Sequence, residues 1–508
     1  MGMATAPAGA HDDRLKRSAI GLPSAMAMSL AFISPTIGVI FISALIANQA
    51  GAAAPFAFII GTIGVLLMAN TLAEFTKRVP SAGTFYTFAG QAAGRHVGFI
   101  VGWLLFLTYA FQSPINTNLF GFFVPQVLLR DFGIDLTAYW WVFALAIIAF
   151  VGWLGYESLK YSLRIDIIFV ALEVLVMAIL LIYIVVTGGA EGQSPQSFTP
   201  SLAPGPAAPD AFTGVFQAFI FILFAFFGFE SSTTVAEECE NPKRNIPIAL
   251  LGSVGLTGLW FIFALYAVIV GFGPSAEGIA KLAGDAVPLD TLARRYLGDY
   301  YAVFIDLAAL AANIAVLIAI HNANFRIFYA MGREGVLPSW LGKTHPVHKT
   351  PYHAIFGFSA FSAVLTIGTG LLWGPQAAFG NNGYFSSLGI LPIFILINIL
   401  LVTFMWTRYR SEFSWWRHGL LPIAGAITFI LALWKSVDPL PAAPLNVFPL
   451  AILVWVAIGV VLMLWIQSRD PRRLDTIGKT MFIEVDEEYE GEIAERGLGE
   501  EVESHTGA

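Results

Sequence analysis

The sequence predicts an all-α integral membrane protein with about twelve transmembrane helices. Of its 508 residues, 57% are hydrophobic and only 12% are charged, whereas an ordinary soluble domain is about one quarter charged. The mean hydropathy is +0.73. Apolar stretches long enough to cross a bilayer recur along the whole chain. We expect spans near 20–48, 53–73, 84–124, 138–158, 165–187, 211–236, 248–272, 301–330, 353–373, 384–406, 418–436 and 447–467.

Basic residues predict how these spans are oriented. Most Lys and Arg residues of the connecting loops fall on one side, which also holds both ends of the chain. The opposite side receives Arg130, Lys281, Arg294, Arg295 and Lys435. By the positive-inside rule, both termini are expected in the cytoplasm and the protein in the plasma membrane. The mixed-charge stretch 274–300 is expected to form short helices on the outer face.

The C-terminal segment from Met481 onward holds ten acidic residues against Arg496, so it accounts for the formal net charge of −7. An acidic segment with few aromatic residues is typical of a disordered tail. The net charge therefore says nothing about a substrate. We expect five regions: a cytoplasmic tail over 1–17, two five-helix repeats over 18–187 and 188–410, two further helices over 411–470, and the acidic tail over 471–508.

Two of the expected spans carry residues that interrupt a helix. Within the apolar run 219–247, Gly228 permits an unusual backbone conformation. Glu230 follows it, and a carboxylate at membrane depth costs about 2.5–3.5 kcal/mol unless it faces a cavity or a partner. Ser34–Gly38 places Pro35 at the middle of the first span. Each interruption opens a block of five spans, which predicts an inverted 5+5 repeat with discontinuous helices 1 and 6.

These residues also carry a resemblance to a known family. The ordered series Phe226-Phe-Gly-Phe-Glu230, Ala236-Glu-Glu238, Asn241-Pro-Lys-Arg244 and Ile246-Pro247 resembles the sixth-helix signature of the amino acid–polyamine–organocation (APC) superfamily. The stretches 80–88 and 98–103 are similar to the same superfamily. The resemblance covers roughly residues 18–470 and implies a twelve-span permease with alternating access. Ser34-Pro35-Thr36 replaces the glycine-rich first signature of many members and looks more like bacterial putrescine importers.

The two interruptions predict a substrate site. Amides at half-helix N-termini suit a carboxylate, and opened carbonyls at Ile33 and near Phe224–Phe226 suit an ammonium group. An α-amino acid matches both ends, whereas a diamine matches only the second. The expected substrate-binding residues are Ile33, Ser34, Thr36, Gly38, Tyr109, Phe224, Phe226, Gly228 and Glu230. The alternatives are that Tyr109 and Phe224 only pack in the core and that Glu230 only caps the lower half-helix.

Protons are the expected coupling ion. Glu173 and Glu230 are intramembrane acids and therefore candidate proton carriers; they could instead supply counter-charges for a cationic substrate. Related permeases often carry a lysine at the position of Glu173; the alternative is a neutral carboxyl held by a neighbouring helix. The eighth span, 305–324, contains no Ser or Thr, although the resemblance implies hydroxyl ligands there in sodium-coupled members.

Other classes of function are disfavoured. The chain has one cysteine, no phosphate-binding loop and no Gly-X-Ser-X-Gly motif, so we expect neither an enzyme nor direct ATP hydrolysis. His345, His348 and His353 lie among Lys and Pro in a loop, so we expect no metal site there. We also expect no cofactor and no nucleic-acid partner, since the orientation of the spans accounts for the basic loops. A channel or a solute sensor would need a continuous pore or a large soluble domain. We therefore expect an importer of an amino acid. The alternatives are an importer of a polyamine or other organic amine, and an amino acid/amine exchanger.

Overall fold

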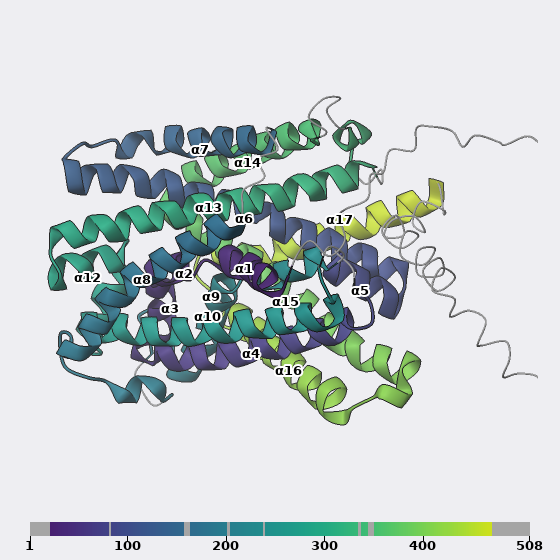
Figure 1. The fold of residues 1–508 in the computed structure, drawn as a ribbon, viewed down its shortest axis with the longest axis horizontal. Coiled ribbons are helices and arrows are strands. Elements are labelled where there is room, and N and C mark those ends of the chain that lie inside the picture. Colours follow the sequence, from purple (N-terminus) through teal and green to yellow (C-terminus); the bar gives the residue numbers. More distant parts are fainter. Residues whose placement is uncertain are drawn as a thin grey trace, which may run out of the picture.

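The computed structural model of the protein describes residues 21–80, 83–156, 163–200, 204–236, 239–333, 337–343 and 350–469. Most of its helices run along the long axis of one bundle (Figure 1). Within this described part, eleven helical segments are long and apolar enough to cross a membrane, and the shorter apolar helix α9 (Ala211–Ala225) lies where the sixth span is expected. The all-helical membrane fold predicted from the sequence is confirmed.

The helices follow the expected order. Residues up to Thr187 contain α1 (Leu22–Ile33), α2 (Pro35–Ile40), α3 (Ile42–Ala50), α4 (Ala54–Thr76), α5 (Thr84–Ala93), α6 (Arg95–Phe132), α7 (Trp140–Tyr156) and α8 (Leu163–Thr187). They are followed by α9, the 3-10 helix η4 (Phe229–Val235), α10 (Pro242–Phe272), α11 (Ala276–Gly284), α12 (Pro288–Tyr296), α13 (Asp299–Arg333), α14 (Tyr352–Trp373) and α15 (Pro375–Arg408). The last two spans are α16 (Leu421–Val437) and α17 (Phe448–Arg469).

The third span differs from the expected single helix over 84–124. It divides at Gly94, whose φ of +88° favours glycine, into the short helix α5 and the 38-residue helix α6. Pro114 and Pro125 lie inside α6 without ending it. Gly90 and Gly98 face each other across the division, since a Cβ on Gly98 would lie 2.9 Å from the Gly90 Cα. Small residues therefore let α5 fold closely against the start of α6.

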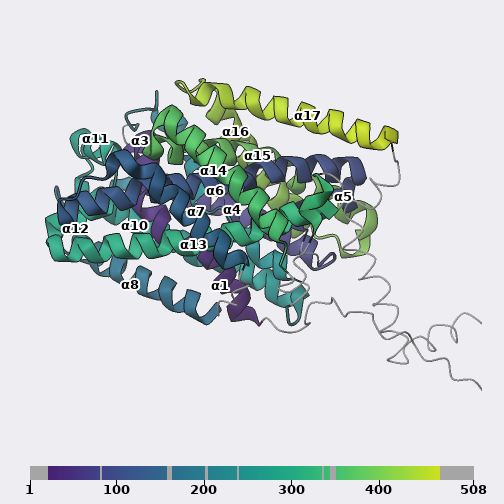
Figure 2. The ribbon, with the colours of Figure 1, turned by 90° about the horizontal axis from the view of Figure 1, so that it is seen from above.

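The interrupted helices occupy the interior of the bundle. Helix α1 packs on α10, on η4 and on α8, while α9 packs on α3, α4 and α15. The long helices α6 and α15 lie against each other, as do α4 and α10. Helices α8 and α17 run along opposite edges of the bundle (Figure 2). The discontinuous helices are thus screened by continuous ones, which is where irregular backbone can exist in a membrane.

Helix α17 is held to α6 by a pair of tryptophans. Trp103 and Trp455 stack with ring centroids 4.5 Å apart. The indole N–H of Trp103 donates to the carbonyl of Trp455 over 2.9 Å, and the indole N–H of Trp455 donates to the carbonyl of Trp103 over 3.0 Å. Both indole donors are therefore satisfied within the bundle.

The expected short helices of the stretch 274–300 are present as α11 and α12. Arg130, at the end of α6, contacts Asp290 of α12 at 2.8 Å. Arg294 of α12 contacts Asp131 at 2.5 Å and Asp290 at 3.0 Å. These ion pairs join α12 to the end of α6. Both carboxylate oxygens of the buried Asp306 on α13 find no hydrogen-bond partner among the described residues, although Asp290 and Asp131 are close enough to interact with it electrostatically.

Candidate functional site

The first interruption lies between α1 and α2. Ser34 adopts a left-handed conformation, with φ of 49° and ψ of 88°. Pro35 has no N–H, so the carbonyl of Ala31 lacks the donor that a continuous helix would supply. The Ser34 side chain accepts a hydrogen bond from the Ile37 N–H over 3.4 Å, and the indole N–H of Trp260 donates to the Pro35 carbonyl over 3.3 Å. The break is therefore stabilised partly by its own residues and partly by α10.

The second interruption lies between α9 and η4. Helix α9 ends at Ala225, and Gly228 takes φ of +90° before the 3-10 turns of η4 begin. The carbonyls of Phe224 and Phe226 accept hydrogen bonds from the N–H groups of Phe227 and Phe229 over 3.2 and 3.1 Å. The backbone is thus tightly turned rather than fully opened, and each of these carbonyls keeps one lone pair for another donor.

The two interruptions contact each other directly. The Ser29 hydroxyl of α1 donates to the Phe229 carbonyl over 2.7 Å and accepts from the Ser232 N–H over 3.2 Å. A Cβ on Gly228 would lie 1.9 Å from the ring of Phe32. Glycine is therefore required at 228 both by its positive φ and by the aromatic ring against it. These contacts place the breaks, about 190 residues apart in sequence, side by side.

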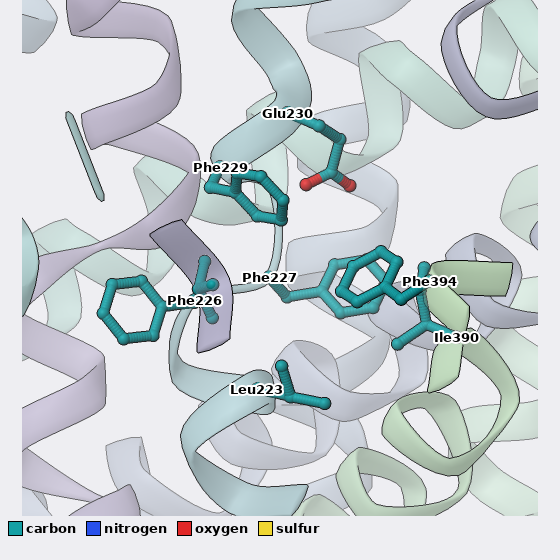
Figure 3. Close-up of a pocket in the computed structure, with 8 residues that line it drawn as sticks. Leu223, Phe226, Phe227, Phe229, Glu230, Ile390 and Phe394 are labelled. Carbon is teal, nitrogen blue, oxygen red and sulfur yellow. The ribbon is translucent and has the colours of Figure 1, made fainter. Parts of the chain in front are cut away.

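A small pocket opens at the second interruption. Its lining residues are Val65, Leu223, Phe226, Phe227, Phe229, Glu230, Ile390 and Phe394. Glu230 is the one ionisable group among them, and its carboxylate points toward the rings of Phe227 and Phe394 (Figure 3). The arrangement is a mostly apolar wall with a single fixed acid, which is the usual composition of a small-molecule site.

Tyr109 of α6 completes this site. Its phenol hydroxyl donates a hydrogen bond to the Glu230 carboxylate. The Tyr109 ring packs edge-on against Phe227 at 5.4 Å between centroids, and its backbone carbonyl accepts from the Asn324 side chain of α13 over 3.2 Å. The second break is therefore joined to α6 through an acid–phenol contact that a cationic group could share.

Glu173 occupies a different position. It lies on α8, is only 4% exposed, and accepts a hydrogen bond from the Thr36 hydroxyl of α2 over 3.0 Å. Thr36 is fully buried. The structure thus brings one acid to each interruption: Glu173 to the first, through α2, and Glu230 to the second, within η4.

The remaining expected residues are distributed unevenly. Phe226 and Glu230 line the pocket, and Gly228 forms the turn beside it. Ile33, Ser34 and Gly38 lie at the first break; a Cβ on Gly38 would lie 2.5 Å from the ring of Phe261. Phe224 does not line the pocket. It packs against Phe379 at 5.2 Å between centroids and covers Gly383 on α15.

Several lining residues were missed by sequence reasoning. Leu223, Phe227 and Phe229 belong to the same aromatic run as the expected residues, so their proximity could have been anticipated. Val65 of α4 and the pair Ile390 and Phe394 of α15, one helical turn apart, carry no such signal. They resemble many other apolar residues of their helices.

No metal site emerges from the described residues, which contain no group of three or more His, Cys, Asp and Glu side chains arranged to hold an ion. Of the three histidines considered from the sequence, His345 and His348 lie outside the described residues. His353 is at the start of α14, where it packs against Trp340 and Tyr352. The single cysteine, Cys239, is buried and free.

The chain is similar in sequence to known membrane transporters over most of its length. The chain is 28% identical over 459 residues to the branched-chain amino acid permease BcaP of Bacillus subtilis, covering 86% of this chain and 90% of that protein. It is 27% identical to the low-affinity putrescine importer PlaP of Escherichia coli, covering 88% and 92%, respectively. It is also 27% identical to the methylthioribose transporter of B. subtilis, covering 86% and 91%.

These relatives differ in the substrate that their names state, but each matches the present chain over nearly its whole length. The sequence profile of the amino acid permease family matches residues 25–473. This range begins within α1 and runs past the end of α17, so it takes in both interruptions and all the spans between them. The protein therefore belongs to the amino acid permease family of the APC superfamily.

Proposed function

We propose that this protein is a secondary active transporter that imports an amino acid across the plasma membrane by proton symport with alternating access, both termini facing the cytoplasm. The observation that carries the proposal is the contact between the two interrupted helices, with one buried acid at each. A site formed by matched helix breaks binds a small solute through peptide groups, and it can open to either side when the surrounding helices move.

Peptide groups at the breaks suit both ends of an amino acid. The amino group would be held by Glu230, by Tyr109 and by the free lone pairs of the Phe224 and Phe226 carbonyls. The carboxylate would be held by N–H groups near Ser34 at the start of α2. The apolar lining of the pocket would then contact the side chain, and Val65, Ile390 and Phe394 would determine its permitted size.

Glu173 is the proposed proton carrier. The hydrogen bond that it accepts from Thr36 links its ionisation to the position of α2, because a charged and a neutral carboxyl hold a hydroxyl donor with different strength. Loss of the proton would therefore change how firmly α8 holds the first interruption. Glu230 can serve in the same way through Tyr109.

Proteoliposome transport tests this proposal. Uptake of radiolabelled branched-chain amino acids is measured under an imposed proton gradient, an imposed sodium gradient and no gradient. We expect accumulation only with the proton gradient, and saturable counterflow without any gradient. Gradient-independent, non-saturable flux would indicate a channel instead.

Glu173→Gln separates coupling from binding. We expect the variant to lose proton-driven accumulation but to retain counterflow, since exchange of substrate across the membrane needs no net proton movement. Thr36→Val is the matched control, because it removes the hydrogen bond and keeps the acid; it is expected to lower the rate without abolishing accumulation. Unchanged accumulation by Glu173→Gln would contradict the proposed role.

An organic amine such as putrescine is the second candidate substrate, and one observation favours it. The lining of the pocket contains an acid and no base among its described residues, which suits an ammonium group better than a carboxylate. The 27% identity to PlaP supports the same reading. Competition by unlabelled putrescine and by unlabelled leucine against each labelled substrate decides between the two.

A further inference from the structure

The connection between α15 and α16 carries an unusual concentration of aromatic and basic side chains. We name residues 406–418 the basic hairpin. Its exposed arginines are Arg408, Arg410 and Arg417, and its exposed tryptophans are Trp406, Trp415 and Trp416. Trp415 and Trp416 are 71% and 61% exposed, respectively, which is far more than a packed tryptophan shows.

Local acids do not neutralise these arginines. Glu412 is engaged by Arg78, at 2.9 Å. Glu74 is buried and engaged by Lys77, Arg78 and His418, at 2.7, 2.9 and 3.0 Å. Among the described residues, no carboxylate pairs with any of the three hairpin arginines. Within the described part of the chain, the guanidinium groups of Arg408 and Arg410 contact uncharged groups.

Two of the arginines, Arg408 and Arg410, instead contact aromatic rings, and Arg408 also contacts a side-chain amide. The guanidinium of Arg410 lies over the Trp406 ring at 4.8 Å, and that of Arg408 lies over the Phe404 ring at 5.5 Å. Arg408 also donates to the Gln91 side chain of α5 over 3.4 Å. A guanidinium on a ring face keeps its N–H edges free, so it can still bind an oxyanion in its own plane.

The tryptophans are placed by an irregular start to α16. Residues Trp415–Leu420 form a π-helical turn, in which His418 points inward to Glu74 while Trp415 and Trp416 remain outside. Phe413 packs against Trp406 and Trp415 at 5.2 and 5.3 Å between centroids, which holds these three rings together as one group. The hairpin thus presents apolar rings and free positive charge together.

This combination matches the boundary between acyl chains and phosphate groups. Tryptophans favour that depth in a bilayer, and juxtamembrane arginines attract anionic headgroups at about 1 kcal/mol each. We propose that the basic hairpin is a binding site for an anionic phospholipid of the cytoplasmic leaflet, whose phosphodiester is held by Arg408, Arg410 and Arg417 while its acyl chains lie on Trp415 and Trp416.

The acidic C-terminal tail is the competing occupant. Helix α17 ends at the same end of the bundle as the basic hairpin. Gln467, near the end of α17, contacts His96 at 3.3 Å, and the hairpin residue Arg408 contacts Gln91, which lies five residues before His96 in the chain. The ten acidic residues in the segment from Met481 would be attracted to these arginines by their opposite charge alone. A purely electrostatic partner, however, leaves the two exposed tryptophans unexplained, so the observations favour the lipid.

Quenching of tryptophan fluorescence tests the proposal. The full-length protein is placed in nanodiscs of phosphatidylcholine, in which the mole fraction of a phosphatidylglycerol with brominated acyl chains is raised stepwise. A parallel series uses phosphatidylcholine brominated at the same positions. The Trp415→Phe/Trp416→Phe variant identifies the part of the signal that comes from the hairpin. We expect the brominated phosphatidylglycerol to quench the hairpin signal at a much lower mole fraction than the brominated phosphatidylcholine does.

Two triple variants of equal charge provide the comparison. Arg408→Gln/Arg410→Gln/Arg417→Gln should lose the preference for the anionic lipid by roughly 100-fold, since each arginine contributes about fivefold. Lys243→Gln/Arg244→Gln/Lys343→Gln removes three exposed basic residues elsewhere and should keep it. If the triple hairpin variant does not fold, the three single Arg→Gln variants replace it, and each is expected to lower the preference for the anionic lipid about fivefold.

Four outcomes would overturn the proposal. Equal quenching by the two brominated lipids would show that the hairpin has no headgroup preference. A preference that survives in the triple hairpin variant would place the site elsewhere. A preference that appears only in a chain truncated after Thr480 would show that the acidic tail occupies the hairpin in the full-length protein. Millimolar inorganic phosphate should not compete, because it has no acyl chains to contact the tryptophans; full competition would indicate a free-phosphate site.

Discussion

Gly228→Ala is the sharpest test of how the two helix breaks depend on each other. A side chain at φ of +90° carries a backbone strain of about 1–3 kcal/mol. In addition, the new Cβ would lie 1.9 Å from the ring of Phe32, so the ring must move. Removing a buried Phe side chain altogether costs about 3–5 kcal/mol, and displacement costs part of that. We expect Gly228→Ala to destabilise the protein by roughly 3–6 kcal/mol.

Cys239 provides the assay, since it is the only cysteine and is buried. Its reaction with a fluorogenic maleimide during heating reports the loss of tertiary structure. Gly255→Ala is the matched control, because Gly255 lies within α10 and a Cβ there would meet no atom within 4 Å. That variant should unfold at or slightly above the temperature of the parent protein.

A double-mutant cycle then isolates the contact itself. Phe32→Ala removes the ring that the new Cβ would strike, so adding Gly228→Ala to it should cost about 1–3 kcal/mol less than adding it to the parent protein. The remaining cost is the backbone strain. Strict additivity, or a Gly228→Ala variant as stable as Gly255→Ala, would refute the conclusion that Phe32 of the first break packs on the second.

Three further variants test other contacts. Tyr109→Phe keeps the ring but leaves Glu230 without its donor, so we expect a loss of about 1–3 kcal/mol in the same assay and weaker substrate uptake; adding Glu230→Gln should recover part of the stability. Asp290→Asn should destabilise by about 3–5 kcal/mol because it weakens the two ion pairs that Asp290 makes, with Arg130 and Arg294. Asp306→Asn should be neutral or stabilising because no described group donates to that carboxyl. Trp103→Phe removes one of two reciprocal hydrogen bonds, and we expect faster amide exchange in α17 with unchanged exchange in α10.

Local composition was enough to predict the spans and their interruptions. Pro35 cannot donate a backbone hydrogen bond, and Gly228 followed by an acid cannot continue an ordinary apolar helix. Those statements depend only on neighbouring residues, so they needed no tertiary information. The short helices α11 and α12 were likewise predictable, because mixed charge and turn residues interrupt the apolar pattern there.

The division of the third span at Gly94 was not predicted. Glycine inside an apolar stretch occurs in many uninterrupted membrane helices, and Gly98, Gly102 and Gly121 in the same span do not end α6. The decisive factor is the close approach of α5 to α6, which is a contact between helices. In the same way, the carbonyls expected to be open at Phe224 and Phe226 are partly used by 3-10 turns, because the chain re-forms hydrogen bonds as soon as the geometry permits.

By itself, the sequence determined where the membrane helices lie, which two are broken and which acids are candidates for a functional role. Only the tertiary structure decided that Tyr109 meets Glu230, that Thr36 meets Glu173, and that Val65, Ile390 and Phe394 complete the pocket wall. The physical reason is that a helix in a bilayer is apolar on all sides, so its pattern does not distinguish the face toward lipid from the face toward another helix. Packing of the whole bundle makes that choice, and with it the shape of the site.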